Sequence, residues 1–326
     1  MNRSNGSELI KVQDLAKYYP LHAGIFKKAK VHILAVDGVS FALNKGETFG
    51  LVGESGCGKS TLGRLVAGLE PPTKGDIYLE GESIYYSRRT QKLELARKIQ
   101  IIFQDPYASL NPRQTVGSII GEGLEIHRVA TPKERKEKVI HLMKSVGLHE
   151  NHFTRYPHEF SGGQRQRIGI ARALALEPKL IVCDEPLSSL DVSIQAQVIN
   201  LLLDIQEQFD LTYLFISHDL NVVRHMCDRI AVMYVGKLVE VGTNKEIYDT
   251  PKHPYTKALL ASVPRLTPGA FRRGLVLKGD VPNPASPPSG CYFHPRCRQA
   301  MDICKGKMPD LYSVEGSHHV RCWLYS

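Results

Sequence analysis

The sequence predicts an α/β protein with a parallel sheet whose strands are connected by crossover helices. Segments 180–183 and 212–216 have the length and apolar composition of buried strands, and apolar residues recur at helical spacing in 195–209 between them. A third apolar strand, 48–52, leads into a glycine-rich segment followed by a helix at 60–69. Strands that alternate with helices in this way are typical of a parallel sheet.

The other elements follow in chain order. Strand-like runs broken by polar turns fill the first fifty residues, and 31–41 is the clearest of them. A short helix at 92–98 precedes an apolar strand at 99–103. From residue 105 to 160 the sequence is instead rich in helical segments.

The best-defined helix of that region spans 134–146. Thr131 is a good cap, Pro132 suits the first turn, and Gly147 ends the helix. A further helix is expected at 165–176. These helices predict a helical unit between the strands of the sheet.

In the last third of the chain, the sequence predicts a hairpin followed by a segment of different composition. Strands at 230–235 and 238–241 are expected to pair as a hairpin across a Gly-Lys turn. Composition shifts after Gly242, and the four prolines of 279–290 predict a stiff linker.

The amino-acid composition limits the classes of protein to which this chain can belong. The 326 residues suggest about two domains, and 42% hydrophobic with 23% charged residues excludes wholesale disorder. Because there is no apolar run of about 18 residues and no apolar signal core at the start, we expect a cytosolic chain without its own membrane span. The net charge of +9 permits attraction to nucleic acid or anionic lipid without indicating either.

The glycine-rich segment at 53–60 fits the phosphate-loop pattern G-x-x-x-x-G-K-[ST] and has the required strand before it and helix after it. Its glycines let backbone N–H groups surround phosphate oxygens, and the helix N-terminus favours negative charge. Lys59 would neutralise the β- and γ-phosphates, and Ser60 would bind Mg²⁺. ATP or GTP is expected here, bound by Gly53, Glu54, Ser55, Gly56, Cys57, Gly58, Lys59, Ser60 and Thr61.

Two further strand ends carry polar groups that suit the same site. Asp184 and Glu185 follow the strand 180–183, so that Asp184 can join the Mg²⁺ shell and Glu185 can take a proton from attacking water. His218 directly follows the strand 212–216 and is expected at the same edge of the sheet, near the γ-phosphate.

Four of the seven cysteines crowd into the last 36 residues. In a reducing cytosol this clustering favours metal over disulfides. The spacings of five, six and seventeen intervening residues are unlike zinc ribbons or ferredoxins. Four thiolates suit an iron–sulfur cluster or Zn²⁺ about equally, and His294, His318 or His319 could replace one of them. The candidate ligands are Cys291, Cys297, Cys304 and Cys322.

Taken together, these motifs resemble those of ATP-binding-cassette (ABC) ATPases, in the right order over about residues 8–245. Ser161-Gly162-Gly163-Gln164 resembles the signature motif, and Gln104 the Q-loop glutamine. Asp191 resembles the D-loop aspartate, and His218 the switch histidine. Tyr19 resembles the residue that stacks on adenine, with Tyr18 as a near competitor.

The resemblance implies a fold and a mechanism. The fold is a P-loop cassette with a RecA-like parallel core, an antiparallel β subdomain and a helical subdomain at about 106–165. Two cassettes pair head to tail, so that one subunit's signature residues contact ATP on the other's phosphate loop. Ser60, Gln104 and Asp184 hold Mg²⁺, whereas Glu185, His218 and Gln104 are the catalytic residues.

The tail, residues 246–326, resembles the C-terminal extension of dipeptide/oligopeptide permease ATPases. The similar segments are 253–260 and 287–297, the second of which contains two of the clustered cysteines. Some members of that family carry a [4Fe–4S] cluster in this tail, so the resemblance favours a cluster, with a structural role, over Zn²⁺ or free thiols. Nickel importers belong to the same subfamily.

The implied function is ATP hydrolysis that energises import of di- or oligopeptides, and nickel or another small solute is the alternative substrate. The implied partners are an identical or paralogous ATPase subunit, two transmembrane permease subunits and an extracytoplasmic binding protein, at the cytoplasmic face of the cell inner membrane. A non-transport ABC ATPase acting on nucleic acid is a further alternative. It usually carries a coiled-coil or zinc-hook insert, and no sustained heptads are present, so no nucleic-acid partner is expected.

Overall fold

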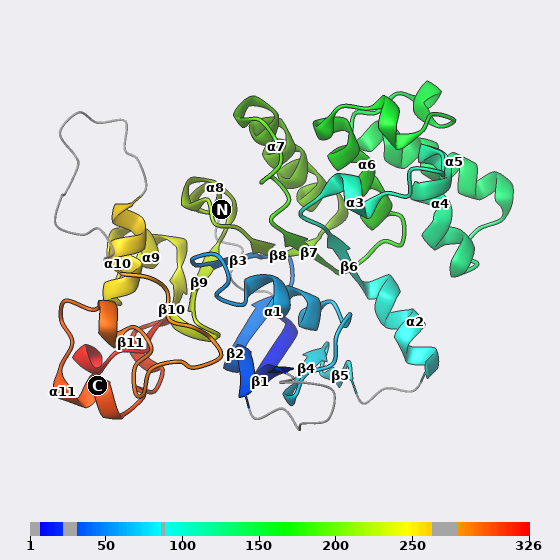
Figure 1. The fold of residues 1–326 in the computed structure, drawn as a ribbon. Helices are drawn as coiled ribbons and strands as arrows, with labels where there is room; N and C mark the ends of the chain where they lie inside the picture. The colour runs from blue at the N-terminus through cyan, green and yellow to red at the C-terminus, as the bar shows by residue number, and fades with distance from the viewer. Residues whose placement is uncertain (1–6, 22–30, 86–88, 263–278) are drawn as a thin grey trace.

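The computed structural model describes the chain over residues 7–21, 31–85, 89–262 and 279–326. These ranges contain an eight-stranded sheet of order β11-β12-β10-β9-β3-β8-β7-β6 and a four-stranded sheet of order β2-β1-β4-β5 (Figure 1). The neighbours β9, β3, β8, β7 and β6 run parallel to one another, which confirms the predicted parallel core. The large sheet comprises β3 (Thr48–Val52), β6 (Ile99–Ile102), β7 (Leu180–Asp184), β8 (Thr212–Ile216), β9 (Arg229–Tyr234), β10 (Lys237–Thr243), β11 (Tyr312–Glu315) and β12 (His318–Val320).

The central strands are buried on both faces, and successive residues serve two different cores. In β7, Leu180 and Val182 pack into the core that contains helix α1 (Lys59–Val66) and the small sheet. Ile181 and Cys183 point the opposite way, into the core formed with the helices of the other face. This alternation follows from the two-residue period of a strand, and it explains why the strand is apolar throughout.

The antiparallel sheet covers the α1 side of the large sheet. Its long strand β1 (Glu8–Leu21) pairs with β2 (Val31–Asn44) on one side and with β4 (Lys74–Leu79) on the other. The short β5 (Glu82–Ser83) completes it, and α2 (Arg89–Lys98) leads from there to β6. The predicted strand at 31–41 is therefore present and continues to Asn44.

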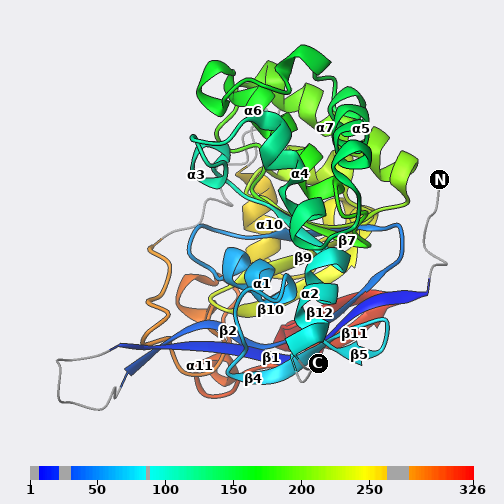
Figure 2. The same cartoon turned by 90° about the vertical axis from the view of Figure 1, so that its right-hand side faces the viewer.

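Helices gather at the end of the molecule opposite the antiparallel sheet (Figure 2). The predicted helix at 134–146 is α5, and Thr131 caps it in a reciprocal capping box with Glu134. Gly147 follows the helix at φ +73°, a left-handed conformation that suits glycine. The elements here are α3 (Pro106–Ser109), α4 (Val116–Ile126), α5 (Pro132–Ser145), η1 (Glu150–His152), η2 (Pro157–Glu159), α6 (Gly162–Leu174) and α7 (Val192–Phe209).

Residues after the β9–β10 hairpin pack back onto the sheet. Strand β12 pairs antiparallel with β10, and β11 pairs with β12, so the end of the chain extends the large sheet. Residues 279–290 form no helix or strand, and Leu34 N–H of β2 donates to Pro284 O (3.0 Å). The remaining helices are α8 (Leu220–Met226), α9 (Asn244–Asp249), α10 (Pro254–Ala261), η3 (His294–Arg296), α11 (Asp302–Gly306) and η4 (Trp323–Tyr325). No helix in the described ranges combines the length and the apolar character that a membrane span requires.

A buried carboxylate joins this tail to the sheet. Glu240 of β10 accepts hydrogen bonds from the backbone N–H groups of Lys252 (2.6 Å) and His253 (2.9 Å), and its Oε1 lies 2.7 Å from Nε2 of His318. Burial acts to raise the pKa of Glu240, but these hydrogen bonds outweigh it and leave the pKa lowered. The Nε2 atom of His318 is therefore engaged in the contact with Glu240.

Because the imidazole of His253 is buried, we expect the folded protein to lose stability in acid. Burial lowers the pKa of this imidazole from 6.5 to about 4. Between these values the unfolded chain binds a proton that the folded chain does not, so the free energy of unfolding falls as the pH drops from 6.5 towards 4, by about 3 kcal/mol in full. Urea unfolding from pH 7 to pH 4.5 measures this loss.

The matched variant is His253→Asn, which does not titrate and keeps an acceptor for the Tyr255 N–H that His253 Nδ1 now binds (3.0 Å). We expect its unfolding free energy to depend less steeply on pH than that of the wild type. Equal slopes would contradict the assignment to His253.

Candidate functional site

At two positions of the loop between β3 and α1, the backbone adopts a conformation that only glycine can accommodate. Gly53 and Gly58 have φ values of +155° and +107°. A Cβ atom at Gly58 would lie 1.9 Å from Ala35 O, and one at Gly53 would lie 2.2 Å from Met233 O. The loop is therefore enclosed by the backbone of β2 and β9, and its glycines are required by contact as well as by conformation.

Lys59 begins helix α1 and folds back over the loop. Its Nζ donates to the carbonyl oxygens of Gly53 (2.9 Å) and Glu54 (3.0 Å), and only 4% of the residue is exposed. A buried ammonium group held at the mouth of a helix N-terminus is placed to bind an anion.

The next residue faces the carboxylate at the end of β7. Ser60 Oγ donates to Asp184 Oδ1 (2.8 Å), although the two residues are 124 positions apart in sequence. Burial raises the pKa of Asp184, and the hydrogen bond from Ser60 opposes this shift. A hydroxyl and a carboxylate oxygen at this distance are the donor types that Mg²⁺ takes in phosphate-loop sites.

Glu185 brings the other predicted catalytic side chains together. Its Oε2 accepts from Gln104 Nε2 (3.1 Å) and lies 3.1 Å from Nδ1 of His218. The backbone of Glu185 is left-handed, at φ +48°, and its N–H donates to Ile216 O of β8 (3.0 Å). Three residues from the ends of β6, β7 and β8 thus meet at one edge of the sheet, as the parallel topology requires.

One pocket collects most of the residues predicted to bind nucleotide. Three further residues that the sequence did not predict also line it: Ile33 and Ala35 of β2, and Pro284 of the segment before the clustered cysteines. The predicted residues that line it are Tyr19, Ser55, Gly56, Gly58, Lys59, Ser60, Thr61, Gln104 and Glu185.

Three predicted loop residues do not line the pocket: Gly53, Glu54 and Cys57. Gly53 is enclosed against Met233 O. The Cys57 side chain is buried, and its carbonyl accepts from Gly236 N–H (2.9 Å). The Glu54 side chain turns towards the tail, where it pairs with Arg296.

The two neighbouring tyrosines of β1 are separated by the alternation of the strand. Tyr19 lines the pocket, and its hydroxyl donates to Glu70 Oε2 (2.5 Å). Tyr18 donates to Asp37 Oδ1 (2.8 Å). Burial raises the pKa of both phenols, that of Tyr18 to about 12. Of the two, Tyr19 is the one with a ring at the pocket.

The signature and D-loop residues lie apart from that pocket. Ser161 caps α6, accepting from Gln164 N–H (3.4 Å), while Ser161 N–H donates to Gln164 Oε1 (3.1 Å). Gly162 and Gly163 form the first turn. Asp191 is exposed at the start of α7. In the described part of the chain, none of these residues lines the pocket.

The four clustered cysteines lie near one another in the tail and are unpaired. The pKa of Cys291 is raised to about 11, mainly by burial and in smaller part by the neighbouring Cys304, Cys322 and Cys297. Among the described residues, no group of three potential ligands is arranged to hold a metal ion. The donors therefore fit a thiolate site in kind and in grouping, but they do not converge on a metal position.

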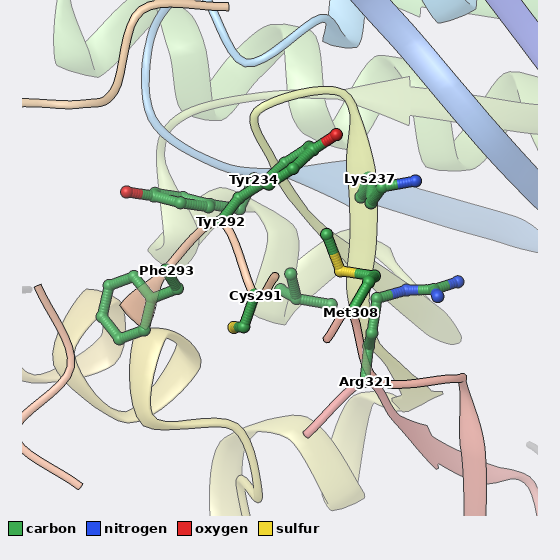
Figure 3. Close-up of a pocket in the computed structure, with 8 residues that line it drawn as sticks. Tyr234, Lys237, Cys291, Tyr292, Phe293, Met308 and Arg321 are labelled. Atoms are coloured by element: carbon green, nitrogen blue, oxygen red, sulfur yellow. The ribbon is translucent and has the colours of Figure 1, made fainter. Parts of the chain in front are cut away.

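Cys291 also lines a small pocket between the β9–β10 hairpin and the tail (Figure 3). Its neighbours there include Tyr234, Met308 and Arg321, and its sulfur points away from Met308. Each of the histidines considered as a substitute ligand has one ring nitrogen at hydrogen-bond distance from another group. His318 binds Glu240, and the Nδ1 atoms of His294 and His319 lie 2.9 Å and 2.8 Å from backbone carbonyl oxygens.

The site has three features that together define a P-loop ATPase. They are a buried lysine over the phosphate loop, a hydrogen-bonded serine–aspartate pair, and a glutamate flanked by a glutamine and a histidine. The family model "ABC transporter" matches residues 36–188, and the model "Oligopeptide/dipeptide transporter, C-terminal region" matches residues 239–304. The chain belongs to the family of ABC ATPases that comprises the oligopeptide and dipeptide transport ATP-binding proteins.

The relatives match over nearly their whole lengths. The chain is 54% identical to the oligopeptide transport ATP-binding protein AppF of Bacillus subtilis, over 100% of both chains. It is 49% identical to the dipeptide transport ATP-binding protein DppF of Escherichia coli, over 94% of this chain and 92% of the relative.

Solved structures agree on the fold. The dimeric, post-hydrolysis ATP-binding cassette MJ0796 bound to ADP and Pi has a TM-score of 0.64 and 27% identity, covering 72% of this chain and 99% of that one. CbiO1 of Clostridium perfringens gives a TM-score of 0.64 at 28% identity, covering 74% and 91%. The protein is an ATPase of this fold.

Proposed function

We propose that this protein hydrolyses ATP to drive import of di- or oligopeptides, as the ATP-binding subunit of an ABC transporter. The observation that carries the proposal is the 54% identity to an oligopeptide transport ATP-binding protein along the entire chain, tail included. The subunit would lie on the cytoplasmic face of the membrane, bound to two permease subunits that receive peptide from an extracytoplasmic binding protein. In this assignment, the ATPase unit is residues 8–245, with a helical subdomain at about 106–165, and 246–326 is an extension.

The site residues take the following roles in the proposal. Backbone N–H groups of the 53–58 loop and the Lys59 ammonium bind the phosphates, while the Tyr19 ring contacts adenine. Ser60 and Asp184, with Gln104 at the γ-phosphate side, would hold Mg²⁺, which neutralises developing charge on the phosphates.

Hydrolysis would begin with proton removal from water. Glu185 accepts this proton as the water attacks the γ-phosphorus, and the bond to the ADP oxygen breaks. His218 and Gln104, both at hydrogen-bond distance from Glu185 Oε2, orient this carboxylate and stabilise the transferring phosphoryl group.

A second subunit would complete the site. Ser161, Gly162, Gly163 and Gln164 lie outside the pocket of their own chain, and they open a helix whose N-terminus suits an anion. In the proposed head-to-tail dimer they contact the γ-phosphate bound by the partner, and Asp191 lies at the interface. The dimeric form of the related cassette MJ0796 supports this arrangement.

For the tail we propose a [4Fe–4S] cluster bound by Cys291, Cys297, Cys304 and Cys322. All four thiols are unpaired, and Cys304, Cys322 and Cys297 lie close enough to Cys291 to contribute to the raised pKa of that thiol. Zn²⁺ is the alternative occupant of the same sulfurs. The cluster would fasten the tail, because nothing in ATP hydrolysis requires an electron.

Reconstitution tests the transport proposal. The protein would be assembled with its permease subunits and binding protein in vesicles, and ATP-dependent uptake of labelled di- and oligopeptides would be compared with uptake of Ni²⁺. We expect uptake of peptides alone, and none without ATP. Uptake of Ni²⁺ without peptide uptake would overturn the peptide assignment, and ATPase stimulation by nucleic acid would overturn the transport role.

A further inference from the structure

The tail reaches the phosphate-binding loop through one arginine. Arg296, in η3 and next to Cys297, donates from Nη1 and Nη2 to the two carboxylate oxygens of Glu54, at 2.7 Å and 3.1 Å. This two-pronged geometry is the strong form of an arginine–carboxylate pair. The Arg296 side chain is 6% exposed and that of Glu54 is 24% exposed, so solvent screens the pair little.

A tyrosine from α10 holds the same loop residue by its backbone. Glu54 N–H donates to Tyr255 Oη (2.9 Å), and Tyr255 is fully buried. Arg296 Nη1 also donates to Tyr234 Oη of β9 (3.3 Å). Both the side chain and the backbone of Glu54 are thus held by residues from beyond the hairpin, more than 200 positions away in sequence.

The contact between Arg296 and Glu54 bears on nucleotide binding because Glu54 carries a negative charge. Glu54 is the second residue of a loop that must surround phosphate oxygens, where an uncompensated carboxylate would repel ATP. Arg296 cancels that charge and draws the carboxylate towards the tail. Pro284, a second tail residue, lines the pocket itself.

We propose that Arg296 is a positioning residue for ATP: by neutralising and holding Glu54, it makes the phosphate-binding loop depend on the C-terminal extension. The inference rests on the proposed nucleotide site. It assigns Arg296 a role in binding rather than in the chemical step, because Arg296 reaches the loop through Glu54, which lies at the phosphate-binding end of the site and is not one of the predicted catalytic residues.

The test measures binding of a fluorescent ATP analogue, together with the KM and kcat of ATP hydrolysis, on the full-length chain. We expect Arg296→Ala to raise Kd and KM about tenfold, less than for a fully buried charge pair because the Glu54 side chain is 24% exposed, and to change kcat less than twofold. Arg296→Lys keeps the positive charge but cannot form the two-pronged contact with the carboxylate. Its Kd and KM should therefore lie between those of the wild type and those of Arg296→Ala.

Rescue separates this role from a merely structural one. Adding Glu54→Gln to Arg296→Ala removes the uncompensated charge, so the double variant should bind the analogue within about twofold of Glu54→Gln alone. Lys305→Ala is the control, because this tail lysine is exposed and pairs with Asp302. Its Kd should match that of the wild type.

The outcomes distinguish the two levels of proposal. If the wild type does not bind the analogue, the proposed nucleotide site itself is wrong. If it binds and Arg296→Ala binds equally well, or if Glu54→Gln fails to rescue a weakened Arg296→Ala, the role of Arg296 is overturned. Should Arg296→Ala not fold, Arg296→Lys with and without Glu54→Gln gives the same comparison.

Discussion

Replacing Glu185 by glutamine is expected to reduce ATP turnover by about 10²–10⁴-fold, the contribution of a positioned general base, while ATP binding is retained. The amide keeps the size of the side chain and can still bind Gln104 and His218, which lie 3.1 Å from Oε2 of Glu185. It cannot take a proton from water. If the proposed dimer closes on ATP binding and reopens after hydrolysis, as the resemblance to ABC ATPases implies, ATP should trap Glu185→Gln as a dimer.

Two measurements check this result: phosphate release in single turnover, and molar mass in solution with and without ATP. Glu207→Gln is the matched control, since Glu207 is exposed on α7 and the chemical change is identical. Its turnover should equal that of the wild type. Persistent hydrolysis by Glu185→Gln would refute the role of Glu185 as base.

Replacing Cys297 by serine is expected to abolish iron binding. Protein purified without oxygen should show broad visible absorption and about four iron atoms per chain, the content of a [4Fe–4S] cluster. Serine supplies a much weaker ligand for iron than a thiolate, so both signals should disappear in the variant. Iron and zinc content and the visible spectrum are the measurements.

The control for this variant is Cys227→Ala, which removes a buried thiol outside the tail. It should leave the iron content unchanged. Stoichiometric zinc without iron in the wild type would show that the cluster assignment is wrong, and iron retained by Cys297→Ser would remove Cys297 from the ligands.

Local signals predicted much of the fold. The strand at 212–216 was predicted with its observed bounds, because an uninterrupted apolar run of that length has few alternatives in an α/β protein. Helix α6 begins at Gly162, three residues before the predicted start at 165. The capping box of Ser161 and Gln164 was the signal that could have placed the helix start.

Contacts between distant segments could not be predicted in the same way. The edge of a parallel sheet brings Asp184, Glu185 and His218 together by topology, so a correct fold class was sufficient for them. Nothing comparable links Pro284 or Arg296 to the phosphate loop. The proline-rich segment was predicted only as a linker, since composition describes its stiffness and not the surface it covers.

The pairing of β12 with β10 also bears on self-association. A chain ending at Thr243 would leave β10, whose residues are mostly buried, as an open edge with unpaired N–H and C=O groups. Such an edge invites strands from other copies to pair with it. The sheet instead ends at β11, four residues long with half-exposed and charged positions such as Glu315. The tail thus covers an edge of the sheet that would otherwise be open to pairing with other copies.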